Sequence, residues 1–170
     1  GTSLSRKMCC LHGRMSQKRR ERALRAFEET DGAVLLCTDV AARGLDICDV
    51  EWIVQFDAPQ EPDAYVHRVG RTARLGRRGR ALLYLSPAEE DYLEFLSIRK
   101  CPAAPLDVEP NGLEQSATVA TIRDAILADR AILEAGERGF LSFLRGYKEH
   151  RCPYVLPFDK LQFGSVARSF

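Results

Sequence analysis

The sequence predicts an α/β fold with a mostly parallel sheet and flanking helices, followed by a smaller, mainly helical part. Short apolar runs alternate with stretches of helical periodicity, and this βαβ order favours a parallel sheet covered by helices. After residue 100, prolines interrupt the alternation and only helical periods follow. The 170 residues are 45% apolar and 29% charged, which is typical of a globular domain with an appendage.

Apolar runs predict the strands of the first part. They cover residues 8–11, 33–37, 53–56 and 81–85. Between the first two runs, residues 16–27 have the period of a helix, with Leu24 and Phe27 on its inward face. These elements give the first part its βαβ order.

Prolines and a capping box mark the two later helices of this part. Pro59 and Pro62 open a helix that carries an arginine-rich segment. Ser86, Pro87 and Glu89 match a capping box with proline at the first helical position. We therefore expect a helix from residue 87 to about residue 97.

The composition changes after residue 100. Pro102, Pro105 and Pro110 indicate a linker, because proline lacks the N–H that regular structure needs. We assign residues 1–99 to the first domain, which looks N-terminally incomplete, 100–116 to the linker, and 117–170 to a helical extension. The extension also looks incomplete at its end.

An aromatic stripe and two glycines distinguish the extension. Phe140, Phe143 and Tyr147 share one helix face and are predicted to be core residues. Gly136 and Gly139 each weaken that helix by about 1 kcal/mol relative to alanine, which indicates close approach of another helix or of the sheet. A final apolar anchor is expected at Leu161, Phe163, Val166 and Phe170.

The most informative segment is HRVGRTAR, at residues 67–74. Arg68, Arg71 and Arg74 recur every three residues, so a short helix or tight turn can direct Arg71 and Arg74 the same way. A guanidinium group is planar, permanently charged and bidentate, and it suits phosphoryl oxygens. Arginine runs also occur on solvated helix faces. The neighbouring motif is therefore needed to favour a phosphate site over a solvated face.

That motif is TDVAARGLD, at residues 38–46, directly after the predicted strand 33–37. It combines a hydroxyl, two carboxylates, a guanidinium group and a glycine. Ligands of parallel α/β sheets collect beyond the carboxyl ends of the strands. The two motifs together predict a phosphate-binding site.

These two segments resemble motifs V and VI of the DEAD-box RNA helicases. LHGRMSQKRRER, at residues 11–22, resembles the HG and Q-x-x-R elements that precede them. Three ordered motifs are far more specific than one. The resemblance covers residues 8–99 and implies the second RecA-like domain of an ATP-dependent RNA helicase, with ATP and Mg²⁺ as cofactors.

The resemblance implies a role in the ATP site for two groups of residues. Asp46 matches the position that contacts the ATP ribose, and Arg71 and Arg74 match the pair that reaches the γ-phosphate, with Arg74 as the arginine finger. His67 and Arg68 match positions that couple the nucleotide state to domain closure. The catalytic residues expected in this chain are therefore Arg71 and Arg74.

A second set matches the family's RNA-facing positions, and its members can contact the RNA backbone without reading bases. They are Gly13, Arg20, Thr38, Arg43 and Gly44.

Two positions depart from the family pattern. Arg14 stands where many members have an acidic residue, and Ala73 replaces the usual glycine. The alanine implies a helical rather than a left-handed backbone at residue 73.

The sequence lacks a phosphate loop and a D-E-A-D segment, so the Mg²⁺ ligands are expected on the absent first RecA-like domain of the same protein. This chain alone is predicted to be inactive. The six cysteines do not have the spacing of zinc ligands, so we expect no metal site in this chain. We expect the cysteines to be reduced thiols.

A separate resemblance covers the end of the chain. GFLSFLRGYKEH and LQFGSVARSF are similar to the C-terminal extension of DEAD-box proteins linked to assembly of the large ribosomal subunit. It implies pre-rRNA and the pre-ribosomal particle as partners, in the nucleus and nucleolus. The candidate rRNA contacts are Arg145, Lys148, His150 and Arg151, although a solvated helix face is the simpler explanation for these residues.

The net charge is only +1, but basic residues crowd segments 6–25 and 68–80, which favours polyanion binding. The longest apolar runs are about five residues against the roughly 20 that a bilayer requires, so we expect an intracellular protein without membrane contact. Two other functions stay open. One is a non-catalytic pre-ribosomal RNA-binding module, and the other is a fragment of a DNA-directed motor.

Overall fold

The computed structural model describes residues 7–39, 47, 50–74, 76–107 and 112–170. Two compact units make up the chain, Gly1–Tyr84 and Leu85–Phe170. The division falls at Leu85, earlier than the boundary expected at residue 100. The segment that follows the last strand therefore groups with the helical extension.

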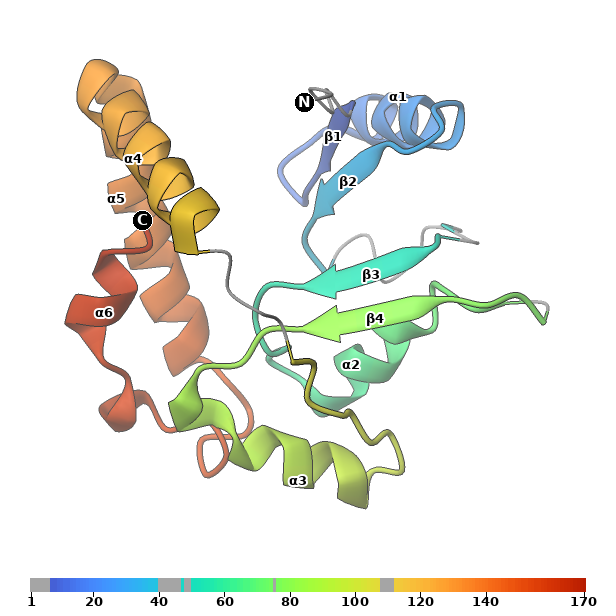
Figure 1. The fold of residues 1–170 in the computed structure, drawn as a ribbon. Helices are drawn as coiled ribbons and strands as arrows, with labels where there is room; N and C mark the ends of the chain where they lie inside the picture. Colours follow the sequence, from blue (N-terminus) through green and yellow to red (C-terminus); the bar gives the residue numbers. More distant parts are fainter. Residues whose placement is uncertain (1–6, 40–46, 48–49, 75, 108–111) are drawn as a thin grey trace. The chain divides into compact units, whose positions relative to one another are not determined.

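In the described residues of the first unit, four short strands form the sheets (Figure 1). Strand β1, Met8–Leu11, pairs in parallel with β2, Val34–Cys37. Strand β3, Trp52–Gln55, pairs in parallel with β4, Arg80–Leu83. The parallel pairing is confirmed, but in the described part of the unit the strands form two separate two-stranded sheets. An apolar run predicts a strand without specifying its neighbour.

Helix α1, Gln17–Glu28, follows β1 and packs against it. Leu24 and Phe27 turn inward, as predicted, and contact the small core formed by Leu11 and Ile47. Leu11 is 1% exposed. This packing holds the loop between β1 and α1, which carries Gly13 and Arg14.

Helix α2, Pro62–Val69, begins with proline in its first turn, as expected. It ends at Val69, because Gly70 caps it and closes the last turn by donating to the Val66 carbonyl at 2.8 Å. The arginines that follow therefore leave the helix. Of the two arrangements that the spacing allowed, a short helix or a tight turn, the structure has the turn.

The second unit begins with a 3₁₀ turn, η1, Pro87–Glu89, and helix α3, Asp91–Ile98. The capping box is confirmed by a 2.7 Å hydrogen bond from the Ser86 amide to the Glu89 carboxylate. One continuous helix from residue 87 was wrong, since the first turn is 3₁₀.

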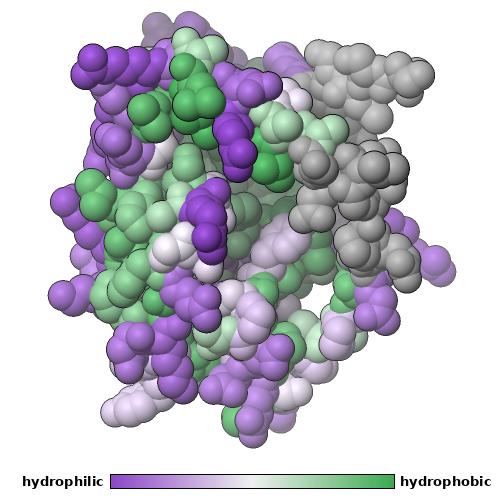
Figure 2. Space-filling model, turned by 60° about the vertical axis from the view of Figure 1, so that its left-hand side comes forward, coloured by the Kyte–Doolittle hydropathy of each residue, from purple (hydrophilic) through white to green (hydrophobic). Residues whose placement is uncertain are grey.

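Helix α4, Gly112–Ala128, starts within the predicted linker, because no proline follows Pro110 to stop a helix there. Asp129 then caps helix α5, Arg130–Lys148, by accepting from the Ala131 amide at 2.8 Å. Helices α4 and α5 pack against each other. Figure 2 brings this side of the chain forward and shows apolar side chains interspersed with hydrophilic ones. In the described part, no helix is long and apolar enough to cross a bilayer.

The predicted aromatic stripe packs against the end of the chain. The Phe170 ring lies 6.0 Å from that of Phe140 and 5.7 Å from that of Phe143. A Cβ on Gly136 would lie 2.6 Å from the Phe170 carbonyl oxygen, and one on Gly139 would lie 3.2 Å from the ring. The close approach that the glycines indicated is confirmed, but the partner is Phe170 rather than a helix or sheet.

Tyr147 links α5 to the start of the same unit. It is 8% exposed, and its hydroxyl donates to the Glu89 carboxylate. Burial first, then the Glu89 charge and this hydrogen bond, raise the pKa of Tyr147 far above its usual value of 10.0. The chain then completes the unit with η2, Phe158–Lys160, and α6, Phe163–Ala167.

Candidate functional site

Arg68 connects the two motifs of the predicted site. It lies in the last turn of α2, and its Nε donates to Asp39 Oδ1 at 2.6 Å while Nη2 donates to Oδ2 at 2.8 Å. Its Nη1 donates to the Gln55 side chain at 3.2 Å and to the Asp57 carbonyl at 3.0 Å. The sequence named Asp39 only as one carboxylate of its motif. Its partner is decided by the fold.

The Asp39 carboxylate also acts on the residue that ends β2. Local burial and then the Asp39 charge raise the pKa of the Cys37 thiol, and the Arg68 charge opposes them. The thiol therefore stays protonated at neutral pH. This site gives Cys37 no thiolate with which to act as a nucleophile.

Figure 1 shows the loop that follows α2. In the sequence, this loop contains Arg71 and Arg74. Two consecutive turns shape its start, because the amide of Arg71 donates to the Arg68 carbonyl and that of Thr72 donates to the Val69 carbonyl, each at 3.1 Å. The Arg71 Nε is buried. Arg74 is half-buried, and its Nε donates to the Gly70 carbonyl at 2.6 Å.

Ala73, between the two arginines, has a φ of 56°. The helical backbone expected at this position was wrong. The conformation is left-handed, which glycine adopts without strain and alanine does not. The physical reason lies outside residue 73, because the neighbouring Thr72 forms a parallel bridge with Val50 and so sets the direction of the chain.

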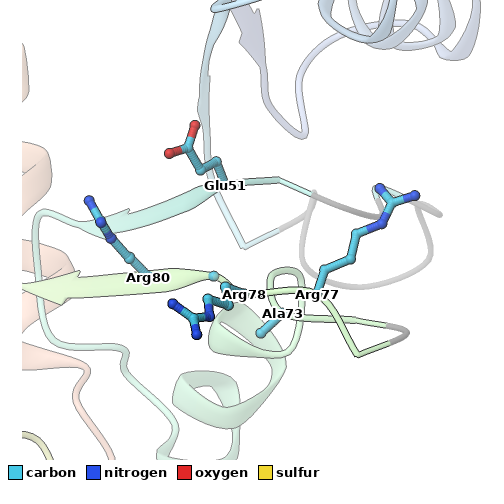
Figure 3. A pocket seen from close by; sticks show the side chains of 6 residues that line it. Glu51, Ala73, Arg77, Arg78 and Arg80 are labelled. Carbon is cyan, nitrogen blue, oxygen red and sulfur yellow. The ribbon is translucent and has the colours of Figure 1, made fainter.

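A hollow of about 520 Å³ opens beside this loop. In Figure 3 the side chains of Arg77 and Arg78 point in different directions, while Arg80 and Glu51 extend from neighbouring strand starts. The Arg80 guanidinium also lies 5.0 Å from the centre of the Trp52 ring. The hollow is basic, but its guanidinium groups do not converge on one point.

The structure brings together part of the predicted RNA-facing set. Arg20 Nη2 donates to the Gly13 carbonyl at 2.7 Å, and its Nε donates to the Met15 carbonyl at 3.1 Å. Thr38 is exposed directly after β2, and its amide donates to the Leu11 carbonyl at 3.2 Å. Because β1 and β2 are parallel neighbours, both segments emerge at the same sheet edge.

The remaining predicted residues divide between two cases. His67 is exposed on α2. Arg43, Gly44 and Asp46 lie outside the described residues. In the described ranges, no three His, Cys, Asp or Glu side chains are grouped as metal ligands.

Two family models match the chain, in the order that the sequence predicted. The helicase conserved C-terminal domain matches residues 2–76, and the C-terminal extension of SPB4-like ATP-dependent rRNA helicases matches residues 129–170. The chain is 34% identical to the DEAD-box protein SrmB of E. coli, covering 62% of this chain and 69% of that one, with a TM-score of 0.50.

The chain belongs to the DEAD-box helicase family. It is 48% identical over 159 residues to DEAD-box ATP-dependent RNA helicase 49 of Arabidopsis thaliana, a match that covers 94% of this chain and 28% of the relative. Domain 2 of the DEAD-box helicase Mss116p, solved with an RNA duplex, aligns over 95% of this chain and 62% of that one, with a TM-score of 0.74 and 26% identity. The predicted RecA-like second helicase domain with a helical extension is thus confirmed.

Proposed function

We propose that the full-length protein is an ATP-dependent RNA helicase, and that this DEAD-box chain supplies half of its ATP site. The chain spans only 28% of its Arabidopsis relative, so the first helicase domain is provided by the rest of such a protein. The observation that carries the proposal is the loop after α2. It presents Arg71 and Arg74 from a backbone that several hydrogen bonds fix.

In this proposal Arg74 is the arginine finger and Arg71 its companion on the γ-phosphate. The Arg74 Nε bond to Gly70 orients the guanidinium group, which is a planar, bidentate donor suited to phosphoryl oxygens. Such a group neutralises charge on the transferring phosphoryl and accelerates transfer by about 10³ to 10⁵. Asp46 would contact the ribose, and Mg²⁺ would take its ligands from the first domain.

Arg68 and His67 would couple the nucleotide state to domain closure. Arg68 pairs with Asp39 and supports the α2 end from which the loop departs. A displacement at Arg71 or Arg74 would therefore reach the segment after β2. Exposed His67, on the same helix turn, is available to the first domain.

The RNA-binding edge is proposed to consist of Gly13, Arg20, Thr38, Arg43 and Gly44. Arg20 holds the Gly13 loop through two carbonyls, so its role includes shaping that loop. Thr38 lies at the same sheet edge. Contacts of this kind fix an RNA backbone without reading its sequence.

We further propose pre-rRNA as the substrate, within a pre-ribosomal particle in the nucleolus. The SPB4-like rRNA helicase extension supports this. Arg145, Lys148 and Arg151 are exposed, and they are the candidate RNA contacts of this extension. His150 is not available, because it is only 8% exposed and its ring lies 6.3 Å from that of Tyr147.

The test is RNA-stimulated ATP hydrolysis by a protein that carries both helicase domains. Arg74→Ala should lower kcat by about 10³ while RNA binding persists, because the finger acts on the transition state. Arg130→Ala, at an exposed arginine of α5, is the control and should hydrolyse ATP like the unmodified protein. Unchanged kcat in Arg74→Ala would contradict the arginine-finger role. Absence of RNA-stimulated hydrolysis by the unmodified protein would favour the non-catalytic RNA-binding module.

Two further measurements separate the alternatives. The isolated chain should hydrolyse no ATP above background. Magnesium-dependent ATP hydrolysis by the isolated chain would contradict the proposal that it supplies only half of the ATP site. Matched RNA and DNA oligonucleotides should compete unequally for the protein, with RNA preferred, since contacts to the 2′-hydroxyl distinguish the two. Equal competition would favour the DNA-directed motor.

A further inference from the structure

We infer that Thr72 is a positioning residue, whose buried hydroxyl fixes the loop between Arg71 and Arg74 for phosphoryl transfer. The inference rests on the proposed function of those two arginines. Thr72 stands between them in the sequence and is itself 6% exposed, so it cannot contact a nucleotide directly. Its influence must pass through its neighbours.

The first contact of Thr72 is with the chain just before β3. Its hydroxyl donates to the Val50 carbonyl, and the Glu51 carbonyl oxygen lies 3.3 Å from the same Oγ1. Val50 and Thr72 also form an isolated parallel bridge. The side chain and the backbone of Thr72 are thus both held to the segment that precedes β3, which lies outside the loop.

The second contact is with Gly79, just before β4. A Cβ at residue 79 would lie 2.1 Å from Thr72 Oγ1 and 2.6 Å from the Ala73 amide nitrogen. Only glycine fits at position 79, because a Cβ there would collide with Thr72 and Ala73. Thr72 therefore lies between the entries to two paired strands, where it has little room to move.

Both arginines depend on this position. Arg71 precedes it with its Nε buried, and Arg74 follows after Ala73 in the left-handed conformation. Alanine adopts that conformation only at a cost in free energy, so the surrounding contacts must hold it. Without the Thr72 hydroxyl bond, Ala73 can relax toward the right-handed region, and the path from Arg71 to Arg74 changes direction.

The experiment uses the protein with both helicase domains and compares three threonine variants. Thr72→Val keeps the shape but removes the donor, Thr72→Ser keeps the donor, and Thr30→Val removes a hydroxyl that donates to the Ala26 carbonyl at 2.8 Å in α1. Misplacing a catalytic group by about 1 Å can cost on the order of 10²-fold in rate. Thr72→Val should therefore lower kcat by at least about tenfold, with the KM for ATP and the RNA affinity nearly unchanged.

Thr72→Ser should restore most of the lost kcat, and Thr30→Val should behave like the unmodified protein. The decisive measurement is Thr72→Val combined with Arg74→Ala. Thr72 positions Arg74 as well as Arg71, so part of its effect disappears once Arg74 is absent. Thr72→Val should therefore cost a smaller fold-loss in the Arg74→Ala background than in the unmodified protein. An equal fold-loss from Thr72→Val in both backgrounds would overturn the inference and leave a structural role.

The two proposals fail differently. Unchanged kcat in Arg74→Ala overturns the arginine-finger function, whereas loss in Arg74→Ala with full kcat in Thr72→Val overturns only the positioning role. All variants are assayed below their melting midpoints, measured by circular dichroism. If Thr72→Val does not fold, Gly79→Ala displaces the same hydroxyl sterically. Its kcat should fall in the same way, and full kcat in folded Gly79→Ala overturns the inference.

Discussion

Arg68 donates hydrogen bonds of 2.6 and 2.8 Å to the two carboxylate oxygens of Asp39, across a sequence separation of 29 residues. The Arg68 side chain is 21% exposed and that of Asp39 is 42% exposed. This bidentate pair joins the segment after β2 to the last turn of α2. The pair therefore connects two motifs that are separate in the sequence.

Breaking this pair should destabilise the first unit measurably. We expect Asp39→Ala and Arg68→Ala each to lower the free energy of unfolding by about 1.5 to 3 kcal/mol, the range for hydrogen bonds to charged groups. The double variant should cost less than the sum of the two. The free energy of unfolding of Arg68→Lys should lie between those of the unmodified protein and Arg68→Ala, because an ammonium group cannot form the bidentate pair of a guanidinium group. Urea denaturation measures all four.

The matched control is Arg130 and Glu134 on α5, 2.9 Å apart, with Arg130 89% exposed. Its coupling should be below about 0.5 kcal/mol, as for exposed pairs in general. A coupling for Arg68 and Asp39 as small as that of the control would contradict the structural role given to the pair.

The left-handed Ala73 predicts opposite effects of two substitutions in one loop. Ala73→Gly should raise the free energy of unfolding by roughly 0.5 to 1 kcal/mol, because glycine removes the strain at φ 56°. Gly76→Ala should lower it by about 1 kcal/mol, since Gly76 has a φ of 76°. Thermal denaturation checks both. Equal signs would show that the backbone at residue 73 is not left-handed in solution.

The glycines of α5 should resist replacement despite the helical propensity of alanine. Gly136→Ala places a Cβ against the Phe170 carbonyl, so the ring contacts with Phe140 and Phe143 weaken. We expect a net loss of about 1 kcal/mol, as the lost aromatic contacts exceed the propensity gained. Near-ultraviolet circular dichroism should report the loosened rings.

Gly164→Ala in α6 is the comparison, because its added Cβ meets nothing within 4 Å. It should be neutral or slightly stabilising. A stabilising Gly136→Ala would mean that Phe170 does not pack on α5.

Tyr147 predicts a pH dependence at the alkaline end. Its pKa is raised in the folded state, so its contribution to stability is complete below about pH 10, the unfolded pKa, and is lost as the pH rises further toward the folded pKa. Tyr147→Phe should cost about 1.5 to 3 kcal/mol at pH 7, the magnitude of a buried hydrogen bond to a charged group. The difference between the two proteins should shrink above pH 10. A difference that stays constant to pH 12 would contradict the Glu89 bond.

Patterns local in sequence predicted the elements well. The apolar run at Met8–Leu11 is a strand, and the capping box at Ser86 is present with Glu89 as its partner. Such signals depend on neighbours within a few residues, which the sequence displays directly. The end of α2 at Val69 and the start of α4 at Gly112 were not predicted, because tertiary contacts often extend or shorten a helix.

The sequence by itself determined the family, the order of the elements and the residue types of the proposed site, because these follow from local patterns and from motif spacing. Only the tertiary structure decided that Asp39 pairs with Arg68 and that the Thr72 hydroxyl donates to the Val50 carbonyl. It also decided that Phe170 packs against Gly136. Each joins residues far apart in the chain. The free energy of such a contact depends on distance and burial in space, which composition and periodicity do not contain.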